Sequence, residues 1–258
     1  MSQRVPVLVY HHVYPDGHPE LGRPSGEKAT GVIAESDFRR QIEHVRSSGW
    51  QAISTTRLVD WIEGREEVPA RSVVIHFDNG WLDAWTMSMP IMKEYGLTAT
   101  SFVITDGTEA ATEGRAAAVT TSTEGAVQKP FITWAHAEGL LDEGWEIGAH
   151  SSKHPKFAEL HDAEGDEGVL EEIETSNTLF EQRLGFVPQH FAYPSGSRND
   201  RTDALLAPHY RSLRLWEFSS PPRWTFTDRH TPLTSIECQN VDSTVPFDDF
   251  ARIFSEAG

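Results

Sequence analysis

The stretch from Ser72 to Trp81 reads S-V-V-I-H-F-D-N-G-W, and it decides which fold the rest of the chain is expected to have. Its β-branched, apolar first half is typical of a buried strand. The strand ends in Asp78, Asn79 and Gly80. Parallel α/β folds keep their reactive side chains at the carboxyl ends of strands, so these residues are candidate functional groups. Asp, Asn and Gly are equally common in turns, and the stretch alone leaves both interpretations open.

The composition is that of an ordinary globular protein with an acidic balance. The 258 residues are 38% hydrophobic and 24% charged, and 22 Lys and Arg stand against 39 Asp and Glu, for a formal net charge of −17. A negative field of this size repels phosphate backbones and anionic membrane surfaces, so we expect neither nucleic acid nor membrane insertion. It is compatible with a neutral or cationic substrate, and it is explained as well by solubility or by adaptation to salt.

Cysteine content and hydropathy restrict the class further. Cys238 is the only cysteine, which excludes an intrachain disulfide and a thiolate metal site. No apolar run approaches the roughly 20 residues that a membrane helix needs. The first residues resemble a core strand more than a secretory signal. We therefore expect a cytoplasmic protein, or an extracellular one if a signal has been removed.

Strand and helix patterns alternate along the whole chain, which predicts a parallel sheet or barrel in a single domain, residues 1–258. Residues 106–131 are small, polar and without periodicity, and we expect an inserted loop over the barrel mouth or a partly mobile lid. The predicted strands are 5–10, 50–53, 72–77, 98–105, 145–150, 190–193, 211–216 and 234–241. The predicted helices are 36–48, 56–64, 81–95 with an interruption at Pro90, 133–144, 169–185, 200–207 and one from Phe247.

Two later strand ends carry further candidate groups. The segment H-S-S-K-H-P places His150 and His154 four residues apart, and a turn can bring both imidazoles to one metal ion at that spacing. In a chain with 12 histidines, such a pair also arises by coincidence. The segment F-A-Y-P-S-G places Tyr193 and Pro194 at the end of another strand.

In this order, F-D-N-G, H-S-S-K-H-P and F-A-Y-P-S-G resemble the motifs of NodB-type polysaccharide deacetylases, carbohydrate esterase family four. Their signatures are T-F-D-D-G, H-[ST]-x-x-H-P and a Pro-x-Gly core. The opening V-L-V-Y-H-H-V resembles the branch that deacetylates poly-N-acetylglucosamine, and the resemblance extends from about Val7 to Trp216. It implies an α/β fold, a distorted (β/α) barrel of about seven parallel strands. It also implies one divalent metal ion, usually zinc with cobalt or nickel as alternatives, and hydrolytic removal of acetyl groups.

The resemblance also implies residue roles. Asp78 matches the general base, and His150 and His154 match the metal ligands. Two neutral imidazoles and one oxygen ligand leave zinc an open position for water, whose pKa the metal lowers. A backbone N–H from Tyr193 would help to hold the developing oxyanion. His12, Pro194 and Trp216 are the expected substrate contacts, and Trp216 and Trp224 are the aromatic side chains expected to offer a stacking surface.

Three positions depart from the family pattern. Asn79 stands where the family has its third metal ligand, an aspartate. An amide oxygen can coordinate zinc, and Asn79 is the expected third ligand. The alternatives are His12, Asp83 and His76. His12 is favoured as a hydrogen-bonded residue of the barrel mouth, and His76 is equally well explained as a core histidine.

The other two departures concern an arginine and a histidine. The family arginine that pairs with the catalytic aspartate is replaced by Phe191. Arg198 is a candidate substitute, and it is equally compatible with a surface charge. The family's final histidine, its general acid, has no clear match, and His230 is better explained as an exposed loop residue.

These features predict a metal-dependent deacetylase that acts on an N-acetylated amino sugar, as a polysaccharide, an oligosaccharide or a sugar metabolite. An alternative is a cytoplasmic amidohydrolase of a small non-sugar amide on the same fold. A third hypothesis is a metal-free sugar-binding protein.

Overall fold

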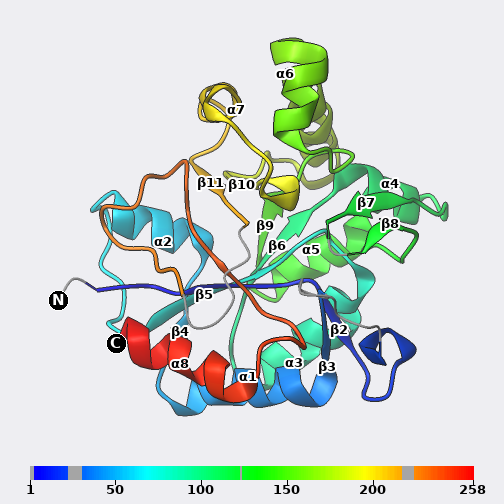
Figure 1. Cartoon of the computed structure of the whole chain (residues 1–258). Helices are drawn as coiled ribbons and strands as arrows, with labels where there is room; N and C mark the ends of the chain where they lie inside the picture. Colours follow the sequence, from blue (N-terminus) through cyan, green and yellow to red (C-terminus); the bar gives the residue numbers. More distant parts are fainter. Residues whose placement is uncertain (1–2, 23–30, 123, 217–223) are drawn as a thin grey trace.

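The computed structural model describes residues 3–22, 31–122, 124–216 and 224–258. Seven parallel strands form one continuous sheet that curves into an incomplete barrel, with helices around its outside (Figure 1). In pairing order, these strands are β11 (Ser212–Arg214), β10 (His190–Ala192), β9 (Glu146–Ala149), β6 (Thr100–Val103), β5 (Ser72–Phe77), β1 (Val7–Tyr10) and β12 (Gln239–Asn240). A short strand, β4 (Gln51–Ala52), also pairs with β5. The structure confirms the predicted α/β barrel of about seven parallel strands.

The strand β5 lies at the centre of this sheet and carries the stretch that predicted the fold. All six of its residues are buried, because β1 and β6 flank it and helices cover the outer face of the barrel. A parallel strand that is covered on both faces requires a continuous apolar sequence. This requirement explains why Val73, Val74 and Ile75 follow one another without a polar residue between them.

Residues 236–240 link the two edges of the sheet. Ile236 forms a parallel bridge with Arg214 of β11, and Asn240 pairs with Val9 of β1. The Ile236 carbonyl accepts a hydrogen bond of 2.9 Å from the N–H of Leu215. The predicted strand 234–241 is therefore mostly irregular backbone, of which only Gln239–Asn240 is a regular strand.

The described α-helices are α1 (Glu35–Ser47), α2 (Thr55–Ile62), α3 (Met89–Glu94), α4 (Thr105–Thr112), α5 (Trp134–Asp142), α6 (Phe157–Leu184), α7 (Asp200–Leu206) and α8 (Phe247–Ala257). All of them except α4 overlap the helices expected from the apolar periodicity. Two small sheets complete the described structure, one of β2 (His12–Tyr14) with β3 (Val32–Ala34), the other of β7 (Val119–Thr121) with β8 (Gly125–Val127). Among the described residues, no helix is long and apolar enough to cross a membrane.

The structure differs locally from the predicted elements. A π-helical turn (Ala84–Ser88) precedes α3, and Pro90 stands in the first turn of α3, where its missing N–H is tolerated. The helix α6 begins twelve residues before the predicted helix and contains a kink at Gly165, whose φ of 69° a residue with a side chain rarely adopts. The segment 106–131 holds most of α4 and the hairpin of β7 and β8, instead of an irregular loop.

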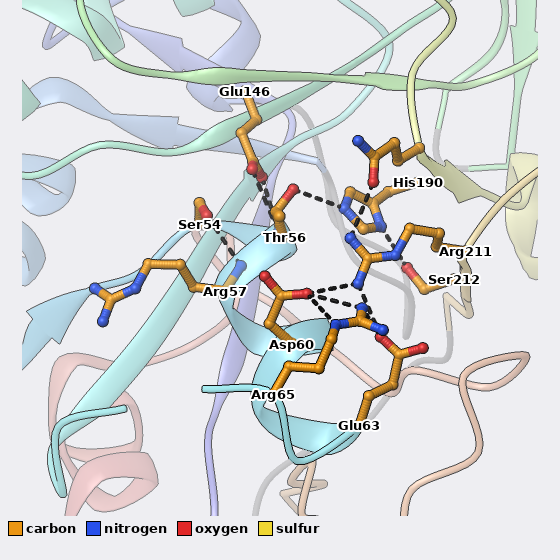
Figure 2. A network of polar contacts seen from close by, with 11 residues as sticks. Ser54, Thr56, Arg57, Asp60, Glu63, Arg65, Glu146, His190, Arg211 and Ser212 are labelled. Carbon is orange, nitrogen blue, oxygen red and sulfur yellow. Dashed lines mark hydrogen bonds and ion pairs between the residues drawn. The ribbon is translucent and has the colours of Figure 1, made fainter. Parts of the chain in front are cut away.

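The start of α2 contacts the first residues of two barrel strands through a polar network (Figure 2). The N–H of Thr55 at the start of this helix donates to the Glu146 carboxylate of β9 at 2.7 Å. The N–H of Thr56 donates to the same carboxylate at 3.2 Å. The Thr56 hydroxyl also contacts Nε2 of His190 at 3.1 Å, and Nδ1 of that ring contacts the Ser212 hydroxyl at 2.9 Å. The start of α2 thus contacts the first residues of β9 and β10 directly, and it reaches β11 through the His190 ring.

Candidate active site

A pocket of about 260 Å³, part of it open to solvent, lies at the carboxyl ends of the barrel strands. Its walls come from the ends of β1, β5, β9, β10 and β11 and from the hairpin of β7 and β8. The residues that line it are His11, Asp78, Asn79, Thr121, Ser122, His150, His154, Ser195 and Trp216. The structure therefore brings together Asp78, Asn79 and both motif histidines, as the sequence predicts for one site.

The carboxylate of Asp78 is held by a buried guanidinium. Nη2 of Arg214 lies 2.6 Å from Oδ1 and 2.5 Å from Oδ2 of Asp78, and the two side chains are only 2–3% exposed. Burial by itself raises the pKa of the Asp78 carboxyl, but Arg214, His150 and His11 together outweigh burial and lower it to about 2. Asp78 is thus an ionised carboxylate at neutral pH.

Arg214 is a candidate functional residue that sequence analysis missed. Arg198, the expected substitute for the family arginine, pairs instead with Asp203 of α7. Arg214 reaches Asp78 from β11, and its guanidinium lies 5.1 Å from the centre of the Phe102 ring. The available signal was a cation within the apolar segment S-L-R-L-W, since a buried strand tolerates an arginine only when a partner compensates its charge.

The histidines 150 and 154 are fixed through one ring nitrogen each. Nδ1 of His150 lies 2.7 Å from the carbonyl oxygen of Ala192, and Nδ1 of His154 lies 2.9 Å from that of Thr120. A carbonyl only accepts, so both rings donate from Nδ1. Burial lowers the pKa of His150 to about 3 and that of His154 to about 4. Both imidazoles are therefore neutral at pH 7, which leaves Nε2 of each as the atom able to bind a ligand.

Asn79 is the third polar residue of interest in this pocket, beside His150 and His154. Its side chain is 2% exposed, and its Oδ1 has no hydrogen-bond partner within the described structure. A buried carbonyl oxygen without a partner costs free energy unless a ligand satisfies it. Asn79 also has a φ of 74°, in the left-handed region.

Strained backbone is concentrated at this site. Four non-glycine residues of the described chain have positive φ, namely Asn79, Ser151, His154 and Ser195. Three of them line the pocket, and Ser151 follows His150 directly. Such conformations cost of order 1–3 kcal/mol each and persist where the surrounding structure imposes them, which is common at functional sites.

The donor set fits one divalent metal ion. Within the described residues, no group of three His, Cys, Asp or Glu side chains is arranged to hold a metal. Two neutral imidazoles and the unsatisfied oxygen of Asn79 nevertheless belong to residues that line the same pocket. Nitrogen and oxygen donors of this kind suit zinc, cobalt or nickel.

The alternative third ligands have other partners. Nδ1 of His12 lies 2.7 Å from Oδ2 of Asp83, and Oδ1 of Asp83 accepts from the backbone N–H of Val13 at 3.0 Å. His76 is fully buried, and its Nε2 contacts the Thr55 hydroxyl at 3.0 Å. None of His12, Asp83 and His76 lines the pocket.

The expected substrate contacts are only partly placed at the pocket. Trp216 lines it, whereas His12 and Pro194 are buried without lining it, and Ser195 takes the place next to Pro194. Trp224 belongs to the hydrophobic core, so it does not offer the stacking surface that was expected.

Tyr193 does not have the free N–H that the oxyanion role requires. Its backbone N–H donates to the carbonyl of Arg214 at 3.0 Å, and its hydroxyl donates to Asp203 at 2.8 Å. The reason is that pairing between β10 and β11 continues for one residue beyond β10. This correction removes Tyr193 from the catalytic groups.

His11 is a second residue that sequence analysis did not assign. It lines the pocket, and its Nε2 lies 3.9 Å from Oδ2 of Asp78. Its Nδ1 is buried without a partner in the described structure. Burial lowers its pKa from the ordinary value of 6.5. Its neighbour His12 was the residue expected from the sequence instead. Two consecutive histidines at the end of a strand point in different directions, and the sequence does not show which of them faces the pocket.

Comparison with known proteins shows the family to which the chain belongs. A family model described as "Polysaccharide deacetylase" matches residues 65–210. A curated relative named "Putative polysaccharide deacetylase YxkH", from Bacillus subtilis (strain 168), is 19% identical over 199 residues. That match covers 77% of this chain and 59% of the relative's length. A second relative from the same organism, the uncharacterized protein YlxY, is 30% identical over 80 residues, 31% of this chain and 24% of that protein.

Solved structures show the same fold. The Streptococcus pyogenes deacetylase PplD, in complex with acetate, superposes with a TM-score of 0.79 at 18% identity, covering 98% of this chain and 99% of that one. IcaB from Ammonifex degensii gives a TM-score of 0.72 at 19% identity, covering 100% and 98%. The barrel fold is therefore shared with proteins of very different sequence.

Proposed function

Because this chain belongs to the polysaccharide deacetylase family, we propose that it is a metal-dependent hydrolase that removes acetyl groups from an N-acetylated amino sugar. One observation supports this proposal most strongly. The ionised carboxylate of Asp78 lines the same pocket as two neutral imidazoles and the unsatisfied amide oxygen of Asn79. A base beside a set of neutral metal donors is the arrangement that hydrolysis by activated water requires.

The donors and the base have separate tasks. Asn79, His150 and His154 would hold one divalent ion, which when bound would acidify a water and polarise the acetyl carbonyl. Asp78 takes one proton from the attacking water as the new carbon–oxygen bond forms. Arg214 keeps Asp78 ionised and directs its oxygens, because the pair is buried and has contacts of 2.5–2.6 Å.

His11 completes the proton path. As the carbon–nitrogen bond breaks, the leaving amine must receive a proton. The proton accepted by Asp78 can pass to His11, whose Nε2 lies 3.9 Å away, and from His11 to the amine nitrogen. The products are acetate and the free amino sugar, and no group other than water and the amide is consumed.

The substrate class that we propose is an acetylated sugar. The PplD structure is that of a deacetylase in complex with acetate, and the aromatic side chain of Trp216, which lines the pocket here, is suited to the face of a sugar ring. Trp216 is oriented by a contact of 3.3 Å from its Nε1 to Oδ1 of Asn240. A second candidate is hydrolysis of a small non-sugar amide by the same groups, since the same pocket residues could act on any acetamide.

The direct test measures acetate release from N-acetylglucosamine oligomers, beside a panel of small acetamides, with the protein loaded with Zn²⁺ or Co²⁺. We expect Asp78→Asn to lower the rate by about 10²–10⁴-fold, the usual contribution of a general base, while metal content stays near the wild-type level. Asp203→Asn, which removes a carboxylate outside the pocket, serves as the matched control and should keep activity. Unchanged acetate release in Asp78→Asn would refute the assignment of the base. Release only from the small amides would select the second candidate, and a wild-type protein that binds no metal would favour a sugar-binding protein without catalysis.

A further inference from the structure

The hairpin of β7 and β8 contributes directly to the pocket. The carbonyl of Thr120 accepts the hydrogen bond from Nδ1 of His154 at 2.9 Å, and Thr121 and Ser122 line the pocket beside that ring. A histidine ligand depends on the group bound to its second nitrogen for its tautomer and its ring orientation. The position of this hairpin therefore decides where Nε2 of His154 lies.

The hairpin is anchored by a cluster of buried charged groups that lies outside the pocket. Oε1 of Glu124 forms an ion pair with Nζ of Lys129, and Oε2 lies 3.5 Å from Nε2 of His12. His12 in turn contacts Asp83 at 2.7 Å, and Lys129 contacts Glu20 at 3.2 Å. The side chains of Glu124 and His12 are only 5% and 2% exposed, and that of Lys129 is 12% exposed. The Glu124 carboxylate on the hairpin is therefore in contact with His12, the first residue of β2.

Apolar packing supports the same attachment. Val119 of β7 belongs to a cluster with Trp81, Ile104 and Phe131, and Val127 of β8 packs against it. The Trp81 ring stacks on His12, with 4.8 Å between ring centres. The apolar and the charged contacts thus meet at His12, and both would have to be broken for the hairpin to move away.

The connection from Glu124 to the metal site is short. The backbone N–H of Glu124 donates to Oγ1 of Thr121 at 3.1 Å, which closes the turn next to Thr120. If Glu124 left its partners, its own charge and that of Lys129 would remain in a largely buried setting, which is costly. Opening the hairpin would also remove the acceptor of His154.

We propose that Glu124 is a positioning residue for the metal site. Through the hairpin it holds the Thr120 carbonyl against His154, so that the insertion is a fixed wall of the site instead of a mobile lid. This inference rests on the proposed function for the role of His154, and it assigns a role to Glu124, a residue that does not itself line the pocket.

The test is a Co²⁺ titration of metal-free protein, followed by calorimetry and by the visible absorption of the bound ion. We expect Glu124→Gln to weaken Co²⁺ binding by about 10- to 100-fold, the usual effect of losing a partner behind a metal-bound histidine, and to alter the spectrum. Glu124→Asp should recover part of the affinity. The matched control is Glu113→Gln in the same insertion, where an exposed ion pair with Arg115 is lost and binding should stay within about twofold of wild type.

A second measurement covers the case in which Glu124→Gln does not fold. Hydrogen exchange of the wild-type protein should show protected amides within 119–127 in the absence of metal, because a fixed wall does not need the ion to order it. Exchange at these amides as fast as in an open loop would overturn the inference.

The two proposals fail in different ways. Co²⁺ binding by Glu124→Gln that equals the wild type, in affinity and spectrum, would overturn the role of Glu124 and leave the proposed function intact. A wild-type protein that binds no Co²⁺ would overturn both, since there would be no metal site for Glu124 to position.

Discussion

Replacing Arg214 by methionine tests the ion pair on which the catalytic assignment depends. Two unit charges about 4 Å apart attract each other by about 4 kcal/mol at an effective dielectric constant of 20. The Arg214–Asp78 pair is more than 95% buried, so water replaces little of this attraction after the substitution. Removing one partner of a buried pair costs about 3–5 kcal/mol, because the other charge is left uncompensated. We expect a loss of this size in the free energy of unfolding of Arg214→Met.

The assay is urea unfolding of metal-free protein at neutral pH, with the double variant Arg214→Met/Asp78→Asn included. Removing both charges leaves no uncompensated ion, so the double variant should recover about 2 kcal/mol or more relative to the sum of the single changes. Arg252→Met provides the control, because the ion pair of Arg252 with Asp249 on α8 is solvent-exposed and should contribute little.

Two results would refute the reasoning. If Arg214→Met unfolds at the same urea concentration as Arg252→Met, the buried pair contributes no more than a surface pair. If the two single changes are additive in the double variant, Arg214 and Asp78 do not interact, and the assignment of Arg214 as the group that keeps the base ionised is wrong.

Three further outcomes are expected. Asn79→Asp adds a charged ligand and should raise Co²⁺ affinity by about tenfold or more, whereas Asn79→Ala should lower it. A competition titration measures both affinities. Equal affinity of Asn79→Ala and wild type would exclude Asn79 as a ligand. Burial lowers the pKa of His190 below 6.5, so the unfolded chain binds a proton that the folded chain does not, and stability falls as pH decreases from 6.5. In His190→Gln the slope of unfolding free energy between pH 6.5 and 5 should be shallower by up to about 1.4 kcal/mol per pH unit, and an unchanged slope would contradict the neutral, buried state. A Cβ atom at position 148 would overlap the Phe102 ring, which packs against Arg214. Gly148→Ala should therefore lower the free energy of unfolding by about 1–3 kcal/mol, measured by thermal or urea unfolding. A variant as stable as wild type would show that the ring can move freely.

Local sequence was sufficient for the elements that depend on local chemistry. The apolar run of β5 predicts a buried parallel strand because both of its faces are covered, and Pro90 predicts an interruption because it lacks an N–H. The same applies to the placement of Asp78 and His150, because strands of one parallel sheet end at a common edge.

The insertion was not predictable in the same way. Its residues are small and polar, and the hairpin of β7 and β8 has no period that separates it from a loop. Its conformation is held by contacts between residues far apart in the chain, such as Glu124 with His12. Local propensity contains no information about such contacts.

The sequence by itself predicted the barrel and the meeting of Asp78, His150 and His154 at one pocket, because periodicity and strand-end motifs act over a few residues. Only the tertiary structure decided which arginine holds Asp78, that His11 and not His12 faces the pocket, and that the Tyr193 N–H is used within the sheet. The physical reason is that charge compensation and hydrogen-bond satisfaction in a buried site depend on distance in space. Arg214 and Asp78 are 136 positions apart in the chain, yet their side chains are in contact.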